Sequence, residues 1–205
     1  MDRLDLAQLI ALAAAPGFAS GIRLYFVLLV VGLLGFFDLA QLPSGLQILA
    51  HPWVLAASGF MVAVEFFADK IPALDSLWDA VHTFIRIPAG AALAAAVFGG
   101  DGVAHQAAWA TAAAILGGTL AATSHFAKAG TRAAVNTSPE PFSNIAVSTA
   151  EDFAVGGLLW LAIAHPFIAA GIVAGLVLFA IWLLPRVFRF IAGLFRRVFG
   201  VVEST

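Results

Sequence analysis

Long apolar runs separated by short polar segments dominate the chain. An α-helix needs roughly 20 apolar residues to cross a bilayer, and a few fewer suffice when its ends reach toward water. The runs that meet or approach this length lie at 4–18, 22–37, 53–67, 89–98, 107–126, 145–164 and 167–184. The pattern predicts an all-α, polytopic transmembrane helical bundle with six to seven crossings.

Two of these runs leave the number of crossings open. Residues 4–18 are broken by Pro16-Gly17, so we expect either a short span or a re-entrant half-helix there. Residues 89–98 follow the amphipathic stretch from Asp69 to Pro88, which we interpret as a helix lying at the membrane interface. Whether 4–18 and 89–98 cross the bilayer fully is not decided by the sequence.

Composition supports the membrane interpretation. Hydrophobic residues make up 62% of the chain and charged residues 11%, against about 45–50% and about 25% in soluble domains. The net charge of −2 offers no basic surface for nucleic acid. The chain has no cysteine, which excludes disulfides and thiolate metal sites. Membrane lipids are therefore the first expected partners.

The basic residues predict an orientation. If the arginine-rich segment 186–205 is cytoplasmic, counting spans backwards places the other basic side chains on the same side, except Arg3. Those side chains are Arg23, Lys70, Arg86, Lys128 and Arg132. We therefore predict a multi-pass protein of the cell inner membrane with a cytoplasmic C-terminus. Residues 186–205 are expected to form a basic amphipathic tail against anionic headgroups.

Residues 1–185 are expected to form one transmembrane domain with an internal repeat. Gly21-Ile22-Arg23 recurs as Gly130-Thr131-Arg132, and His51-Pro52 recurs as His165-Pro166. Matches in the same order predict duplicated three-helix units at 4–72 and 107–185, joined by 73–106. The units would be parallel if 89–98 cross the bilayer and inverted if they do not. Transporters are often built from such repeats.

A polar stripe runs through the predicted interfacial helix. Glu65 and Asp69 share one helix face, and polar residues continue at helical spacing as Asp75, Asp79, His82 and Arg86. The stripe could line an aqueous vestibule, carry protons or bind a cation. For Asp75, Asp79 and Arg86 we favour a polar face in the headgroups. A proton relay would use Asp79, His82 and His125.

Arg23 and Arg132 occupy matching places in the two predicted repeats. Two converging arginines would make a bidentate site for a phosphate or carboxylate. Alternatively, each arginine extends to the interface or neutralises a nearby acid. The acids available for this are Glu65, Asp69, Glu151 and Asp152.

Residues 134–152 form a second polar concentration. Pro139 and Pro141 forbid a continuous helix across this segment, and irregular backbone at membrane depth is tolerated only beside protein or water. An ion or substrate could then contact Asn136, Ser138, Glu140, Asn144, Glu151 and Asp152. Alternatively, the segment is a cytoplasmic loop in which Ser148 or Thr149 caps the next helix.

Catalytic signatures are not found in the sequence. The five histidines show no pairing on one helix face, and there is no Gly-x-Ser-x-Gly or phosphate-binding loop. We therefore predict neither an enzyme nor a cofactor or metal. The favoured function is a small transporter or flippase with a cytoplasm-facing polar cavity for an anionic solute or lipid phosphate. The alternative is a non-catalytic membrane scaffold or partner subunit with structural ion pairs, and either one could be a homo-oligomer.

Three segments carry a resemblance to a known family. They are Ala19-Ser20-Gly21-Ile22-Arg23, Ala68-Asp69-Lys70-Ile71-Pro72 and Ser138-Pro139-Glu140-Pro141. With the polar residues around them they resemble an uncharacterised family of small bacterial multi-pass membrane proteins, catalogued as a domain of unknown function. The resemblance covers the chain to about residue 185. It implies a membrane protein and no particular activity.

Overall fold

A computed structural model describes residues 6–71, 74–99, 104–136 and 141–199, and these residues are helical or connect helices. The elements are α1 (Leu6–Phe36), η1 (Ser44–Ala50), α2 (Pro52–Ala68), α3 (Leu74–Phe98), α4 (Ala104–Val135), α5 (Pro141–Ala164) and α6 (Pro166–Phe199). By length and composition, α1, α3, α4, α5 and α6 can each cross a membrane. A sixth candidate is η1 with α2, a pair bent by 68°. The all-α membrane bundle is confirmed.

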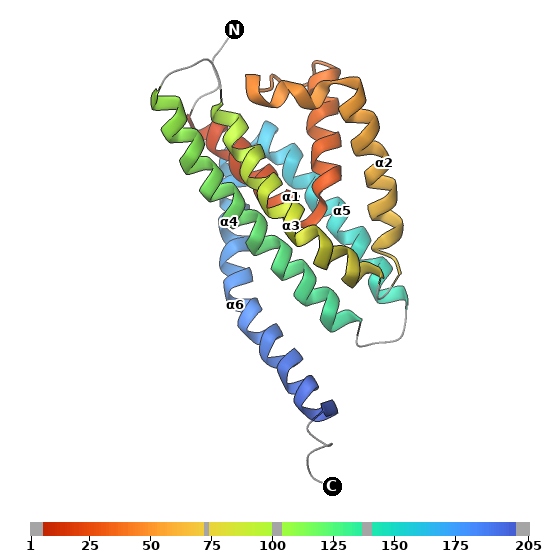
Figure 1. Ribbon diagram of the computed structural model, residues 1–205. Coiled ribbons are helices and arrows are strands. Elements are labelled where there is room, and N and C mark those ends of the chain that lie inside the picture. The colour runs from red at the N-terminus through yellow and green to blue at the C-terminus, as the bar shows by residue number, and fades with distance from the viewer. Residues whose placement is uncertain (1–5, 72–73, 100–103, 137–140, 200–205) are drawn as a thin grey trace.

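Helix α1 is a hairpin of two arms. Its backbone leaves helical geometry at Arg23 (φ −140°, ψ 73°), and the chain turns back there (Figure 1). Leu9 in the first arm lines the same hollow as Pro43 and Ser44, while Gly35 in the second arm lies against Leu42. Both arms thus reach the end of the bundle that carries η1, which we call the η1 end.

The hairpin changes the predicted topology. With the break at Arg23, the first arm covers 6–22 and the second 24–36, roughly 25 Å and 20 Å of helix, and each is shorter than the ~30 Å hydrocarbon core. The sequence predicted a break at Pro16-Gly17, but Pro16 lies inside the helix and the break falls at Arg23. Residues 24–36, most of the span predicted at 22–37, form the returning arm, and whether either arm crosses the bilayer stays a prediction. Helices α2 to α6 then run between the η1 end and the opposite end, which we call the Lys70 end (Figure 1).

The predicted interfacial helix at 69–88 is also wrong. Helix α3 runs without interruption from Leu74 to Phe98 and packs closely against α4 and α1. Its polar stripe faces the protein: Asp75, Asp79 and Arg86 are buried. The stripe avoids the headgroups because α2 and α4 present opposite charges to it inside the bundle.

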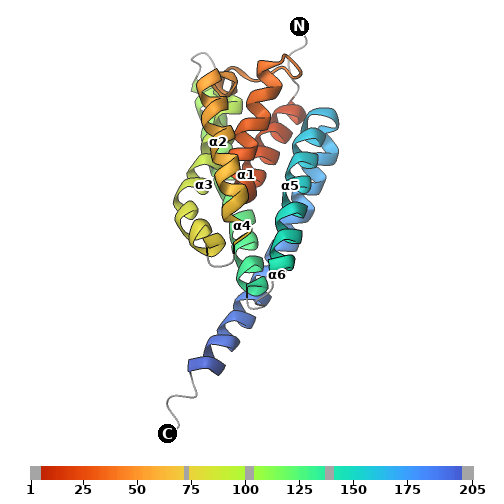
Figure 2. The same ribbon diagram turned by 90° about the vertical axis from the view of Figure 1, so that its right-hand side faces the viewer.

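Three helices extend beyond their predicted bounds. Helix α4 continues past residue 126 to Val135, and α5 already begins at Pro141, where a proline fits the first turn. Helix α6 continues through Pro185 to Phe199, so the predicted tail is an extension of a span. At about 51 Å, α6 outreaches the bundle at the Lys70 end (Figure 2).

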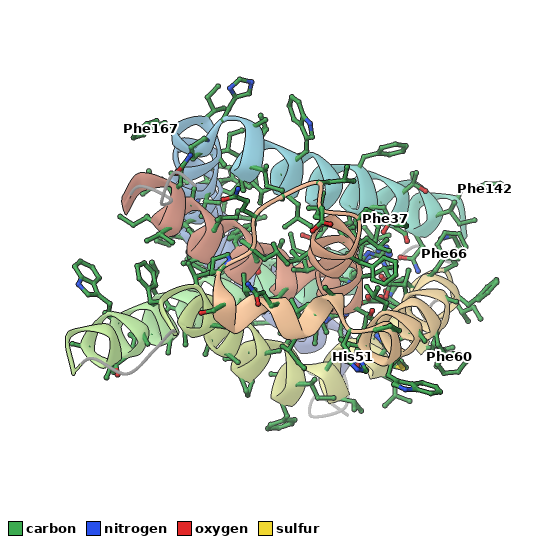
Figure 3. The ribbon with its side chains drawn as sticks, turned by 90° about the horizontal axis from the view of Figure 1, so that it is seen from above. Phe37, His51, Phe60, Phe66, Phe142 and Phe167 are labelled. Carbon is green, nitrogen blue, oxygen red and sulfur yellow. The ribbon has the colours of Figure 1, made fainter. Side chains whose placement is uncertain are left out.

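Small residues let the first arm of α1 approach α4 and α3. A Cβ atom at Gly21 would lie 2.2 Å from the Ala121 carbonyl oxygen, and one at Gly17 would lie 3.1 Å from Gly117 Cα. Such contacts are typical of helix packing in lipid, where small side chains allow close approach. The outer surface is apolar: Phe60, Phe142 and Phe167 point outward from α2, α5 and α6 (Figure 3).

The two predicted repeat units run in the same direction. The arms of α1 and then α2 lead away from, towards and away from the η1 end, and α4, α5 and α6 do the same (Figures 1 and 2). Arg23 lies at the turn of the first unit, and Arg132 lies one turn before the end of α4. This arrangement is the one that parallel units would have. The repeat itself stays a prediction.

Candidate functional site

Ten charged side chains from five helices and the α2–α3 connection meet in the half of the bundle near the Lys70 end. We call them the buried charge network: Arg23, Glu65, Asp69, Asp75, Asp79, Arg86, Lys128, Arg132, Glu151 and Asp152. The first eight are at most 4% exposed. The side chains of Glu151 and Asp152 are 14% and 32% exposed. A charge in hydrocarbon costs several kcal/mol, so this many buried charges require either mutual pairing or a function.

Arg23 connects the tip of the α1 hairpin to α5 and to Asp69. Its Nη1 pairs with Asp69 Oδ2, and its Nε lies 3.0 Å from Asp152 Oδ1. Its Nη2 donates to Ser148 Oγ at 2.7 Å and to the Ser148 carbonyl at 3.1 Å. The break in α1 places the guanidinium at the turn of the hairpin, where it reaches both neighbours.

Helix α4 contributes two further cations. Lys128 Nζ lies 2.9 Å from Asp69 Oδ2 and also donates to the Ile22 carbonyl at 3.1 Å, beside the break in α1. Arg132 donates to Glu151 Oε2 at 2.9 Å and to Asn144 Oδ1 at 2.8 Å. Asp69 therefore faces cations from both α1 and α4.

Arg86 joins α3 to α2. Its Nη2 donates to Glu65 Oε1 at 2.6 Å, and its Nη1 donates to Asp79 Oδ1 at 2.7 Å. All three side chains are buried. One guanidinium thus neutralises two carboxylates, a geometry that a lysine ammonium reproduces poorly.

Two histidines border the network. His125 Nδ1 lies 3.4 Å from Arg86 Nη1, and its Nε2 lies 2.7 Å from Thr83 Oγ1. His82 Nδ1 must donate to the Trp78 carbonyl at 2.8 Å, which leaves Nε2 of the neutral ring to accept from the Tyr25 hydroxyl at 3.1 Å. His82 thus links α3 to Tyr25 of α1 beside the network.

Carboxylates outnumber cations in the network by six to four. Lys70 lies at its edge, with its ammonium 3.1 Å from the centre of the Phe66 ring, and counting it still leaves one excess acid. Three carboxylate oxygens accept no hydrogen bond from the described residues: Asp69 Oδ1, Asp75 Oδ1 and Asp79 Oδ2. These three aspartates also bring one oxygen each within 4.8 Å of one another.

Such a cluster of acids can be neutralised by a metal ion or by protons. Lys128 Nζ lies 2.9 Å from Asp69 Oδ2 and 3.6 Å from Asp79 Oδ1, and Arg132 lies 3.9 Å from Asp75. A metal ion bound among these aspartates would be repelled by both cations. Adjacent like charges favour protonation of one carboxyl group instead.

Asp69 itself stays ionised. It lies in the connection between α2 and α3, and burial alone would raise the pKa of its carboxyl. Lys128 and Arg23 outweigh this effect and hold the pKa of Asp69 below its usual value. The neighbouring cations therefore favour the ionised form of Asp69.

Small hollows reach the network from the sides. One of about 200 Å³ lies between α1, α2 and α5 and is lined by Arg23, Glu65 and Asp152 among others. The larger hollow of about 500 Å³ lies at the η1 end around Asp38 and Gln47, far from these charges. The charges thus gather as expected, but they form a packed core rather than a wide cytoplasm-facing cavity.

The structure brings most of the predicted site residues together. Those in or against the network are Arg23, Glu65, Asp69, Asp79, His82, His125, Arg132, Asn144, Glu151 and Asp152. Asn136 lies at its edge and donates to Asp75 Oδ2 at 3.3 Å. Ser138 and Glu140 lie outside the described residues.

Sequence reasoning missed Lys128 and Ser148 as parts of the site. Lys128 has a recognisable signal, because His125, Lys128 and Arg132 share one helix face at i, i+3 and i+7. The expectation that Ser148 or Thr149 caps a helix is wrong, because both lie inside α5. Ser148 instead accepts hydrogen bonds from Arg23. The two residues lie in distant segments, and no local sequence pattern indicates this contact.

The fold and this site define a polytopic helical membrane protein with a charge network inside its bundle, eight of whose ten members are buried. The chain belongs to the family described as a domain of unknown function (DUF4126), which it matches over residues 10–186. No curated protein and no solved structure matches it.

Proposed function

We propose that the protein is a small membrane transporter or flippase driven by proton binding to the buried charge network. The observation that carries this proposal is that two partly exposed acids, Glu151 and Asp152, contact a core of eight buried charges. The four acids and four cations of that core balance, so Glu151 and Asp152 are in excess of the cations. Acids inside a membrane bundle are typical of the proton relays of transporters.

Protonation of the network would also weaken the attachment of the α1 hairpin to α5. Asp152, the most exposed acid of the network, contacts Arg23, and Glu151 lies beside it at 3.7 Å from Arg23 Nη2. Protonating either acid removes a counter-charge from the guanidinium that holds the α1 hairpin against α5. The hairpin tip is thereby coupled to proton occupancy, as alternating access requires.

The substrate predicted from the two arginines was anionic. Both arginines already face carboxylates of the chain itself, Asp69 and Glu151 among them. The surrounding potential is therefore negative, and a free anion would have to displace these acids. The geometry favours a neutral or cationic substrate group over an anionic one.

Proton flux into vesicles tests the proposal. Purified protein is reconstituted into vesicles of phosphatidylethanolamine and phosphatidylglycerol that contain a pH-sensitive dye, and an inside-negative potential is imposed. We expect faster internal acidification than in empty vesicles. Asp79→Asn should abolish this flux, whereas Asp38→Asn, an exposed acid at the η1 end, should leave it unchanged. Wild-type flux equal to that of empty vesicles would exclude the proposal.

A second candidate is a scaffold or partner subunit held by structural ion pairs. It is favoured by the observation that each of the four cations in the network has a carboxylate within 3.0 Å. It requires that the double exchange Glu65→Arg with Arg86→Glu restore the folding that each single exchange destroys. It also requires that no proton flux accompany the folded wild-type protein.

A further inference from the structure

An apolar groove opens on the membrane-facing side of the bundle, next to the charge network. It encloses about 360 Å³ between α1, α4, α5 and α6, near the lower limit of the roughly 300–1,000 Å³ of ligand pockets. It exists because α4 and α5 scarcely touch, although each packs against α1 and α6. Most of its wall consists of apolar side chains such as Phe18, Ala150, Phe179 and Leu183.

Two members of the charge network also line this groove. Lys128 is almost fully enclosed, and its ammonium is already held by Asp69. Glu151 is 14% exposed, so it is the more accessible of the two. The described contacts of Glu151 with Arg23, Lys128 and Arg132 all go to one carboxylate oxygen, Oε2. The accessible charge in the groove is therefore negative.

The surroundings determine what can fill the groove. A lipid-facing cavity with apolar walls suits a hydrocarbon chain, since water would find few polar partners there. Arg23, Lys128 and Arg132 all contact Oε2 of Glu151, so a headgroup that enters from the groove has to pair with the other oxygen, Oε1. It then meets a network with two more carboxylates than cations. Charge complementarity thus selects a positively charged headgroup.

We propose that this groove binds an amphipathic molecule with one hydrocarbon chain and a cationic amine headgroup, which ion-pairs with Glu151. The proposal rests on the proposed function in one respect: it names the substrate class of the same proton-driven site. A proton on Glu151 and the amine would then compete for the same carboxylate, which is the exchange that a proton-coupled carrier needs.

Photolabelling tests this binding without requiring transport. The probes are dodecylammonium and dodecyl sulfate, each with a diazirine on the chain, added to the protein in lipid nanodiscs. Peptide mass spectrometry then locates the label. We expect the cationic probe to label segments 124–131, 147–154 and 176–183, about tenfold more than the sulfate probe does.

Two variants separate the groove from the general lipid surface. Ala150→Trp fills the groove, and Glu151→Gln removes its accessible charge; each should lower cationic labelling about tenfold. Ala57→Trp adds the same bulk to the exposed face of α2 and should not affect labelling. Retained folding is checked by gel filtration and thermal unfolding. Because Ala150 is exposed, its variant gives an answer even if Glu151→Gln does not fold.

The possible results lead to distinct conclusions. Equal labelling of Ala150→Trp and wild type would overturn the groove as the site, and stronger labelling by the sulfate probe would overturn the cationic headgroup. Labelling as expected, together with no proton flux in vesicles, would leave the binding site standing and remove the transport function. The two proposals can therefore fail separately.

Discussion

Arg23 and Ser148 are 125 residues apart in the chain, yet the Arg23 guanidinium donates to the Ser148 hydroxyl at 2.7 Å. Arg23 marks the break of the α1 hairpin, and Ser148 lies inside α5. Both are buried. This contact fastens the tip of the α1 hairpin to a helix that runs the length of the bundle.

Replacing the hydroxyl should loosen this attachment. Ser148→Ala removes a hydrogen bond to a buried charged group, and we expect a loss of about 1.5–3 kcal/mol in the free energy of unfolding. Thr149→Ala is the control, because the exposed Thr149 hydroxyl bonds only to the carbonyl of Ile145 in its own helix. Reversible unfolding in mixed micelles measures both, and equal losses would contradict the assigned role.

Replacing Arg86 with a residue that cannot pair with both Glu65 and Asp79 should lower the stability of the fold. Arg86→Ala strands Glu65 and Asp79 in a buried site, and such changes cost about 3–5 kcal/mol. Arg86→Lys should recover only part of this, because one ammonium cannot bridge both carboxylates in the same way. Arg189→Ala, at an exposed position on α6, serves as the control. Thermal unfolding checks the order, and near-wild-type stability of Arg86→Lys would contradict the bridging geometry.

Gly21 should be intolerant of even one added carbon. A Cβ there would lie 2.0 Å from Ser124 Oγ and 2.2 Å from the Ala121 carbonyl oxygen, so Gly21→Ala must push α1 away from α4. Overpacking of this kind costs about 1–3 kcal/mol or more. Gly157→Ala is the matched control, because no atom lies within 4 Å of its added Cβ, and there we expect a gain of up to about 1 kcal/mol. A neutral Gly21→Ala would mean that the arm does not pack on α4 as described.

Acidification should weaken the fold through Asp69. The folded-state pKa of Asp69 lies below its usual value, so its contribution to stability is present above the unfolded pKa and is lost as pH falls through the folded pKa. Asp69→Asn should therefore lower the melting temperature at neutral pH and flatten its decline in acid. Asp38→Asn, exposed at the η1 end, should leave the pH profile parallel to wild type. A steep, wild-type profile in Asp69→Asn would contradict this assignment.

The length of the apolar runs was enough to predict a membrane helical bundle, because every helix surface that faces lipid must be apolar. Proline at Pro16 pointed to a re-entrant first segment, but nothing local showed that the turn falls at Arg23. The sequence therefore placed a full span at 22–37 where the chain returns. Apolar length alone does not distinguish a short arm buried by neighbours from a helix that crosses.

The polar stripe of α3 shows a second limit. Asp75, Asp79 and Arg86 share a face, and an isolated helix with this pattern would lie at the interface. These side chains are buried because they pair with Lys128, Arg132 and Glu65, which lie on other helices. Pairing across helices depends on tertiary distance, so the sequence could identify the charges and not their partners.

The α1 hairpin has a consequence for assembly in the membrane. It precedes the other helices in the chain, yet it contacts every one of them, and its tip carries an arginine that lipid alone cannot accommodate. Arg23 at the hairpin tip therefore has no partners until the later segments that carry Asp69 and Ser148 are in the membrane. The hairpin is thus synthesised before the helices that receive it and docks only after they are in place, and its docking completes the bundle.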